Sequence, residues 1–443
     1  MSLAASVRPT RPLGIALAGM VALAVAMGIG RFAFTPILPM MLRDGVVDLQ
    51  RASWLASANY IGYLVGALWC AAAPWLGRRL SWPGWSGTAR VRAGLAATAL
   101  LTAAMALPLP ATWPLWRFAA GVASALVFVY TAGWCLARLA EHGRSALGGV
   151  MFAGPGAGIV ASGLLASALV AAGRHADVAW LVFGVLAAVL SAPIWPVLRE
   201  ATLAASAPSS SAAPATSSAA PEVMAGEVQT GAVAGKAETD AMAGTAPPSG
   251  PASEIACFSL AYGLAGFGYI VTATFLPVIA RTALPGSPAL DLFWPIFGVG
   301  AVAGALLSTR LRVAGDLRLL LAAAYAIQAA GIGIGIVSPT ELGFAVGSLL
   351  LGLPFTTITF FAMQEARRLR PQSAASTIGL LTATYGIGQI VGPPMVSMLL
   401  GRSADASAGF RLSLEVAASA LLAGAGLYLL MRRVWPATGG TSR

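Results

Sequence analysis

Long apolar segments dominate the chain. Twelve windows of about 20 or more residues carry few charged side chains and are rich in Ala, Leu, Gly and Val. A run of ~20 apolar residues lets an α-helix cross the ~30 Å hydrocarbon layer of a bilayer. Because no window alternates apolar and polar residues, we predict an all-α membrane protein and not a barrel. The windows are 13–41, 52–76, 91–109, 113–137, 146–172, 178–198, 255–280, 291–311, 317–337, 341–364, 374–400 and 411–431.

One segment interrupts this pattern. Residues 200–253 consist mainly of Ala, Ser, Pro, Gly and Thr, with too few large apolar side chains to form a core. We interpret them as a flexible linker, which divides the windows into six and six. The predicted organisation is an N-terminal six-helix bundle (1–199), the linker (200–253) and a C-terminal six-helix bundle (254–443).

The two halves also resemble each other weakly. Small residues repeat at nearly constant offsets between corresponding windows, which favours a duplicated six-helix unit. Representative pairs are Gly30 and Gly268 at an offset of 238, Gly121 and Gly352 at 231, and Gly158 and Gly388 at 230.

Composition and charge agree with lipid as the solvent. The chain is 58% hydrophobic and only 10% charged, with a mean hydropathy of +0.79, whereas soluble domains carry roughly 25% charged residues. Most Lys and Arg residues fall in alternate connections that include both termini, so the positive-inside rule places the termini and the linker in the cytoplasm. This bias accounts for the net charge of +11, and we infer no nucleic-acid partner from it.

Two further features leave this topology unchanged. Arg8 and Arg11 before an apolar run imitate a signal peptide, but the run continues past the small residues at 24–26, and cleavage would leave an odd number of spans. The three cysteines map near inner ends of the windows, so they indicate no disulfide framework.

Three short stretches resemble a known family. "GIGRFAFTPILPMM" in the first window, "LWRFAAG" in the fourth and "ATYGIGQIVGPP" in the eleventh are similar to the YbfB/YjiJ-type branch of the major facilitator superfamily. The six-plus-six arrangement outside the linker resembles the superfamily as a whole. The resemblance implies two pseudo-symmetric six-helix bundles that rock about a substrate site near the bilayer midplane. It also implies a multi-pass secondary transporter of a small solute in the bacterial inner membrane.

One superfamily signature departs from this resemblance. The second loop, Gly77 to Arg92, is basic but lacks the Asp of the superfamily motif. The helix-capping and gating interactions credited to that Asp are therefore in question for this chain.

Two arginines inside the windows are the strongest candidates for substrate binding. Arg31 and Arg117 fall in the outer halves of the first and fourth windows, and the superfamily fold implies that both helices line the cavity. An arginine at the centre of a span costs ~3 kcal/mol on insertion scales, and such residues usually face a cavity or a partner. Two guanidinium groups could bind a carboxylate or phosphate through paired hydrogen bonds. The alternative is that each side chain extends to the outer headgroups.

Further polar and small residues complete the candidate site. Polar residues on predicted helices 4, 7 and 11 could contact substrate or form interhelical hydrogen bonds: Tyr130, Tyr269, Tyr385 and Gln389. Tyr269 takes the place equivalent to Arg31 under the offset of 238. Small residues and prolines let helices approach closely or bend, and we interpret the following as hinge or packing positions: Gly28, Gly30, Pro36, Gly154, Pro155, Gly158, Gly388, Gly392 and Pro393.

Acidic residues are missing from the interiors of the windows. Glu365 lies at an inner end beside Arg367 and Arg368, which favours an ion-pair cluster. Without a mid-membrane acid to carry a proton, three transport modes stay open: facilitated diffusion, exchange, or proton coupling through Glu415 or through a proton on the substrate. No nucleotide loop or metal-ligand spacing is present, so we expect neither a cofactor nor a metal, and no enzyme activity.

The sequence therefore predicts a transporter of a small organic anion. The lipid bilayer is the other expected partner, a coupling proton stays open as a third, and we expect a monomer. An exporter of hydrophobic or drug-like compounds is the first alternative, favoured if the arginines are structural and the cavity is aromatic. A non-transporting membrane receptor or scaffold is the alternative of another class.

Overall fold

A computed structural model describes residues 11–80, 86–198, 251–287, 289–311 and 315–436. All regular structure in these residues is helical, and each apolar window coincides with one helix or with consecutive helices. The first half contains α1 (Pro12–Leu23), the π-helix η1 (Ala24–Ile29), α2 (Phe34–Arg43), α3 (Leu49–Leu80), α4 (Gly87–Ala104), α5 (Trp113–Glu141), η2 (Ser145–Leu147), α6 (Gly148–Phe152), α7 (Gly154–Ala171) and α8 (Ala176–Ser191). The second half contains α10 (Ala252–Ala283), η3 (Leu290–Leu292), α11 (Phe293–Ser308), α12 (Arg318–Val337), α13 (Glu341–Gly352), α14 (Phe355–Leu369), η4 (Pro371–Ser373), α15 (Ala374–Arg402) and α16 (Ala406–Val434).

The surface of these helices suits a lipid environment. Within the described ranges, nine helical stretches are long and apolar enough to cross a membrane. Large apolar side chains such as Leu115 and Leu342 are 64% and 73% exposed on such stretches. A bilayer removes the penalty that water would impose on this surface. The predicted all-α membrane fold is thus confirmed.

Several helices begin or end a few residues away from the limits of the apolar windows, because hydropathy does not detect helix caps or helix-breaking prolines. Helix α4 begins at Gly87 and not at 91, since Ser86 caps it by accepting a hydrogen bond from the Ala89 amide at 3.2 Å. Helix α8 ends at Ser191 and not at 198, just before a segment that contains Pro193 and Pro196. Helix α10 begins at Ala252, inside the predicted linker, whose residues 200–250 lie outside the described ranges.

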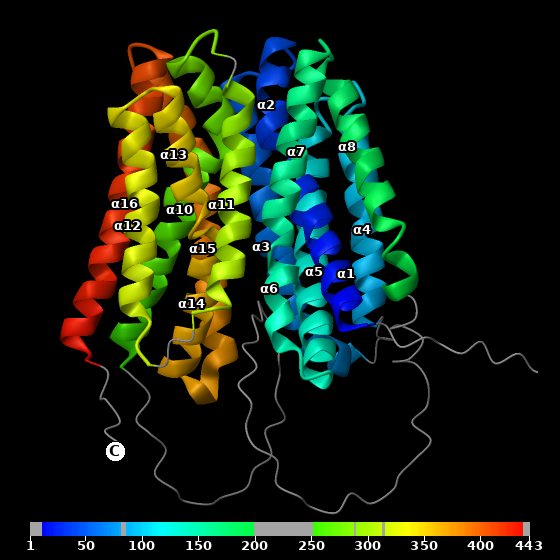
Figure 1. Cartoon of the computed structure of the whole chain (residues 1–443), viewed down its shortest axis with the longest axis vertical. Coiled ribbons are helices and arrows are strands. Elements are labelled where there is room, and N and C mark those ends of the chain that lie inside the picture. The colour runs from blue at the N-terminus through cyan, green and yellow to red at the C-terminus, as the bar shows by residue number, and fades with distance from the viewer. Residues whose placement is uncertain (1–10, 81–85, 199–250, 288, 312–314, 437–443) are drawn as a thin grey trace, which may run out of the picture.

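The helices form two groups that stand side by side (Figure 1). Helices α1 to α8 make one group and α10 to α16 the other, and α1 begins and α16 ends at the same face, hereafter the terminal face. Two antiparallel helix pairs join the groups, α3 with α15 and α7 with α11. Between these pairs, α2 from the first membrane span of one group contacts α10, the first helix of the other group. Residues in the middle of α2 and α10 therefore lie at the junction of the halves.

One glycine crossing in the first half has an equivalent in the second half. A Cβ on Gly28 would lie 2.3 Å from the Cα of Gly158, and a Cβ on Gly388 would lie 2.3 Å from the carbonyl oxygen of Gly263. Gly388 is related to Gly158 by the offset of 230. The segment of α10 that Gly388 contacts corresponds to the segment of η1 around Gly28. Close approach of backbones replaces side-chain packing at both crossings, as is common between helices in membranes.

Candidate functional site

Arg31 lies in a break within the first helix. The π-helix η1 is followed by a turn over residues 30–33 before α2 begins at Phe34. Pro36 has no amide hydrogen, and its ring would collide with the Phe32 carbonyl in a regular helix, so the chain unwinds before it. Single-turn π-helices within α-helices are frequent at functional sites.

The guanidinium group of Arg31 connects the two halves of the protein. Arg31 is only 3% exposed, and its Nη2 donates a hydrogen bond to Oε1 of Gln389 on α15 at 2.5 Å. Gln389 Nε2 in turn donates to the hydroxyl of Tyr269 on α10. Three candidate residues from helices 1, 7 and 11 therefore form one hydrogen-bond chain.

Aromatic rings enclose this chain. The Cζ atom of Arg31 lies 4.2 Å from the ring centre of Tyr63 and 5.1 Å from that of Tyr60, both on α3. Ring faces attract cations, more strongly where water is excluded. We call Arg31, Tyr60, Tyr63, Tyr269 and Gln389 the Arg31 cluster. Tyr385 extends it, because its ring stacks on that of Tyr269 at 5.8 Å between centroids.

Arg117 contacts the backbone of the broken turn. Its Nη1 and Nη2 donate to the carbonyl oxygens of Gly30 and Arg31, both at 3.2 Å. The Thr35 amide donates to Phe32 and not to Arg31, so the break frees the Arg31 carbonyl that Arg117 satisfies. Arg117 is 2% exposed, and its Cζ lies 5.0 Å from the Phe34 ring centre. This geometry assigns Arg117 to positioning of the turn that carries Arg31.

The hydrogen-bonding capacity of Arg31 is not filled. Its Nε is buried without a hydrogen-bond partner, and so is the Nε of Arg117. In the part of the chain that the structure describes, no carboxylate lies within 4.0 Å of either guanidinium group. Both side chains are enclosed by protein, and neither extends to the outer surface. The site therefore combines two cations with an aromatic wall and no carboxylate.

Tyr130 lies apart from this cluster. Its hydroxyl accepts a hydrogen bond from Arg90 Nη1 on α4 at 2.6 Å, and the Arg90 Cζ lies 4.8 Å from the Tyr130 ring centre. Both residues lie toward the terminal face of the first half. Five of the six predicted substrate residues are therefore brought together and Tyr130 is not.

The predicted hinge and packing residues surround the break and its counterpart. A Cβ on Gly30 would meet the Ala26 carbonyl at 2.7 Å, and one on Gly154 would meet the Met20 carbonyl at 2.3 Å. A Cβ on Gly392 would lie 2.5 Å from Ile270. Pro155 stands in the first turn of α7 and Pro393 lies inside α15. These contacts show close packing, while hinge motion at these positions stays a prediction.

Several contacts across the junction were not predicted. Thr35 donates a hydrogen bond to the Ala273 carbonyl at 2.9 Å, and Tyr60 shares one with Thr274 at 2.9 Å. Thr35 and Ala273 are separated by the offset of 238 that relates helix 1 to helix 7. Adding that offset to Arg31 gives Tyr269. The internal repeat therefore indicated that the two halves contact each other along the axis that relates them.

A buried charge cluster lies at the terminal face of the second half. Arg318 is fully buried and pairs with Glu254 and Asp316 at 2.9 Å and with Glu365 at 3.5 Å. Glu365 also accepts hydrogen bonds from Arg368, as the predicted ion-pair cluster requires. The sequence had not indicated the central role of Arg318. Among the described residues, no group of three or more His, Cys, Asp or Glu side chains could hold a metal ion.

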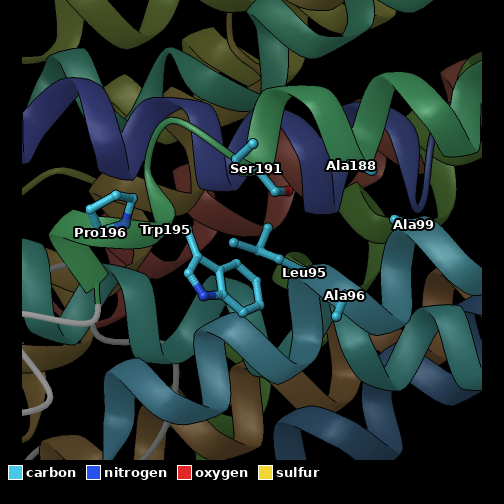
Figure 2. A pocket seen from close by; sticks show the side chains of 8 residues that line it. Leu95, Ala96, Ala99, Ala188, Ser191, Trp195 and Pro196 are labelled. Atoms are coloured by element: carbon cyan, nitrogen blue, oxygen red, sulfur yellow. The ribbon is translucent and has the colours of Figure 1, made fainter.

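Two hollows lie outside the Arg31 cluster. A groove of about 470 Å³ separates α4 and α8 (Figure 2). A cavity of about 20 Å³ in the second half is lined by Thr272 and Ser348, whose buried hydroxyls have no hydrogen-bond partner. Under the offsets of 238 and 231 these residues correspond to Phe34 and Arg117. The position that the Arg117 side chain occupies in one half is thus taken by the hydroxyl of Ser348 in the other.

Comparison with known proteins agrees with this architecture. A family model described as "Uncharacterised MFS-type transporter YbfB" matches residues 23–227 and again residues 228–429. No curated protein matches the chain. The two matches together extend over almost the whole of the described helices. The chain therefore belongs to the YbfB-type family of major facilitator superfamily transporters.

Proposed function

We propose that the protein moves a small organic anion across the bacterial inner membrane by alternating access. The observation that carries this proposal is Arg31, a buried cation at the junction of the halves with an unpaired Nε and no carboxylate within 4.0 Å among the described residues. A carboxylate or phosphate would supply both the missing charge and the missing acceptor. Family membership supports a transporter and leaves the solute open.

Substrate binding would replace an internal contact. Gln389 now accepts a hydrogen bond from Arg31 through a neutral amide oxygen. A carboxylate oxygen forms a hydrogen bond roughly twice as strong with the same donor, so an anion can displace the amide. Since Gln389 lies on α15 and Arg31 on the first helix, this exchange alters a contact between the halves. Binding and relative movement of the halves are thereby coupled.

Flux into sealed proteoliposomes tests the proposal. Purified protein should accelerate uptake of at least one radiolabelled monocarboxylate, dicarboxylate or phosphate ester over protein-free vesicles. Uptake should saturate and should show counterflow when the unlabelled compound is preloaded. Saturable uptake restricted to cations, or no flux of any compound in the panel, would refute the anion proposal.

The aromatic wall favours a second candidate, an exporter of hydrophobic or drug-like compounds. Tyr60, Tyr63, Tyr269 and Tyr385 present ring faces around Arg31, and such faces also bind flat apolar molecules. Under this reading Gln389 keeps its contact with Arg31 and substrate contacts only the rings. Transport of neutral aromatic dyes that is insensitive to removal of the Arg31 charge would support it.

The proposed function includes an orientation of the chain in the membrane. We propose that both termini and the segment between the halves lie in the cytoplasm, and the distribution of Lys and Arg supports this orientation. Reporters fused after residue 443 and within residues 200–250 should both give cytoplasmic signals. A periplasmic signal from either fusion would overturn this orientation.

A further inference from the structure

The groove between α4 and α8 has a defined shape. The helices run antiparallel and approach closely at Gly184, where an added Cβ would lie 2.6 Å from the Cβ of Ala103. From there toward the terminal face they separate, and the space of about 470 Å³ opens between them (Figure 2). Leu95, Ala96 and Ala99 line one wall, and Ala188, Ala192 and Trp195 line the other.

Small side chains keep this groove open toward the lipid. Ala96 and Ala99 lie on one face of α4, and Ala188 on α8 lies one turn before Ala192, the residue that caps the end of α8. Ala188, Ala192 and Trp195 are exposed, while Leu95 forms the buried floor. The walls offer almost exclusively carbon atoms. A linear apolar chain is therefore the occupant that fits the groove.

A cation that pairs with no carboxylate among the described residues marks one end of the groove. Arg92 stands one helical turn before Leu95 and Ala96, on the same face of α4. Its Cζ lies 5.7 Å from the ring centre of Trp195, and its Nε is buried without a hydrogen-bond partner. Where the structure describes the chain, no carboxylate lies within 4.0 Å of this guanidinium group.

We propose that this groove binds one anionic phospholipid, with an acyl chain between α4 and α8 and the phosphate on Arg92. Basic pockets between helices at the cytoplasmic side of membranes bind such headgroups. The end with Arg92 lies toward the terminal face, because α4 begins and α8 ends there. Trp195 contacts Arg92 at this end, and tryptophan is enriched at the headgroup boundary of membrane proteins. A headgroup of net negative charge is favoured over a zwitterionic one, because Arg92 has no counter-charge among the described residues. This proposal does not depend on the identity of the transported solute.

Thermal unfolding of the full chain in a neutral detergent tests the site. Phosphatidylglycerol should raise the melting temperature along a saturating curve. Phosphatidylcholine with the same acyl chains should raise it much less, and glycerol phosphate, which lacks acyl chains, should not raise it. Arg92→Gln should raise the half-saturating concentration of phosphatidylglycerol about tenfold or more, as loss of charge-assisted hydrogen bonds predicts.

Matched variants separate this site from general electrostatics. Arg138→Gln removes one positive charge near the same face, at an exposed residue paired with Glu141, and should leave the phosphatidylglycerol curve unchanged. Ala188→Leu should fill the groove and weaken the response while Arg92 is retained. If both lipids act equally, if Arg138→Gln weakens the response as much as Arg92→Gln, or if glycerol phosphate alone reproduces it, the proposal is wrong. Should Arg92→Gln fail to fold, an unchanged curve for Ala188→Leu would equally refute it.

Discussion

Thr35 donates a hydrogen bond to the carbonyl of Ala273 across the junction of the two halves, at 2.9 Å. The two residues are related by the offset of 238 that relates helix 1 to helix 7, so corresponding helices contact each other at corresponding positions. Arg31 and Tyr269, one turn earlier on each helix, share the same offset and both bond to Gln389. The candidate site is therefore built on the axis of the internal repeat.

Loss of the Thr35 hydroxyl should loosen this junction. Thr35→Val keeps the shape and removes a hydrogen bond worth about 0.5–1.5 kcal/mol, so amides of residues 28–40 should exchange with solvent about two- to tenfold faster. Hydrogen-exchange mass spectrometry measures this. Thr282→Val is the control, because Thr282 donates only to Val278 within its own helix. Equal effects of both variants would deny the junction contact a special role.

The glycine crossing should not tolerate a methyl group. In Gly158→Ala the new Cβ would lie 2.5 Å from the Ala24 carbonyl oxygen, so we expect a loss of about 1–3 kcal/mol and a lower melting temperature. Gly333→Ala on α12 is the control, because nothing lies within 4 Å of its added Cβ. Helix propensity should leave that variant unchanged or slightly stabilised. Equal melting temperatures for the two variants would contradict close packing at Gly158.

Sequence predicted the helices and the hinge or packing positions on either side of Arg31, because apolar run length and the positions of glycine and proline are local signals. It also selected Tyr269 and Gln389 as candidates. It did not predict that Gln389 would contact Arg31, since that contact depends on how α15 is rotated against the first helix. Likewise Glu254 and Arg318 lie 64 residues apart, and nothing local in the sequence indicates their pairing.

The buried charge cluster should be essential for stability of the second half. Arg318→Gln leaves Glu254 and Glu365 buried without their shared partner, and breaking a buried ion pair costs about 3–5 kcal/mol. The melting temperature should fall strongly. Arg138→Gln, which breaks an exposed pair with Glu141, should change stability by about 1 kcal/mol or less. A small effect of Arg318→Gln would show that the cluster does not hold α10, α12 and α14 together.

Low pH should destabilise the end of the first half that lies opposite the terminal face, because Asp44 becomes protonated. Burial opposes its ionisation, but hydrogen bonds from the Ala176 amide, His175 and Arg43 together hold the pKa of the Asp44 carboxyl below its ordinary value of 3.8. Its contribution to stability is complete above that value and is lost as pH falls through the lower, folded-state pKa. Asp44→Asn should therefore flatten the fall in melting temperature below about pH 4. An unchanged acid profile in Asp44→Asn would contradict this assignment.

The affinity of Arg31 variants for an identified substrate anion shows whether Arg31 binds the transported anion. Arg31→Lys keeps the charge but not the planar fork, so we expect binding to weaken at least about tenfold, and Arg31→Ala should abolish it. Arg144→Ala, at an exposed position in the connection after α5, serves as the control and should bind like the unmodified protein. Isothermal titration of the purified, folded variants gives these affinities. If Arg31→Ala binds the anion as tightly as the unmodified protein, Arg31 is not the anion-binding residue and the proposed binding site is wrong.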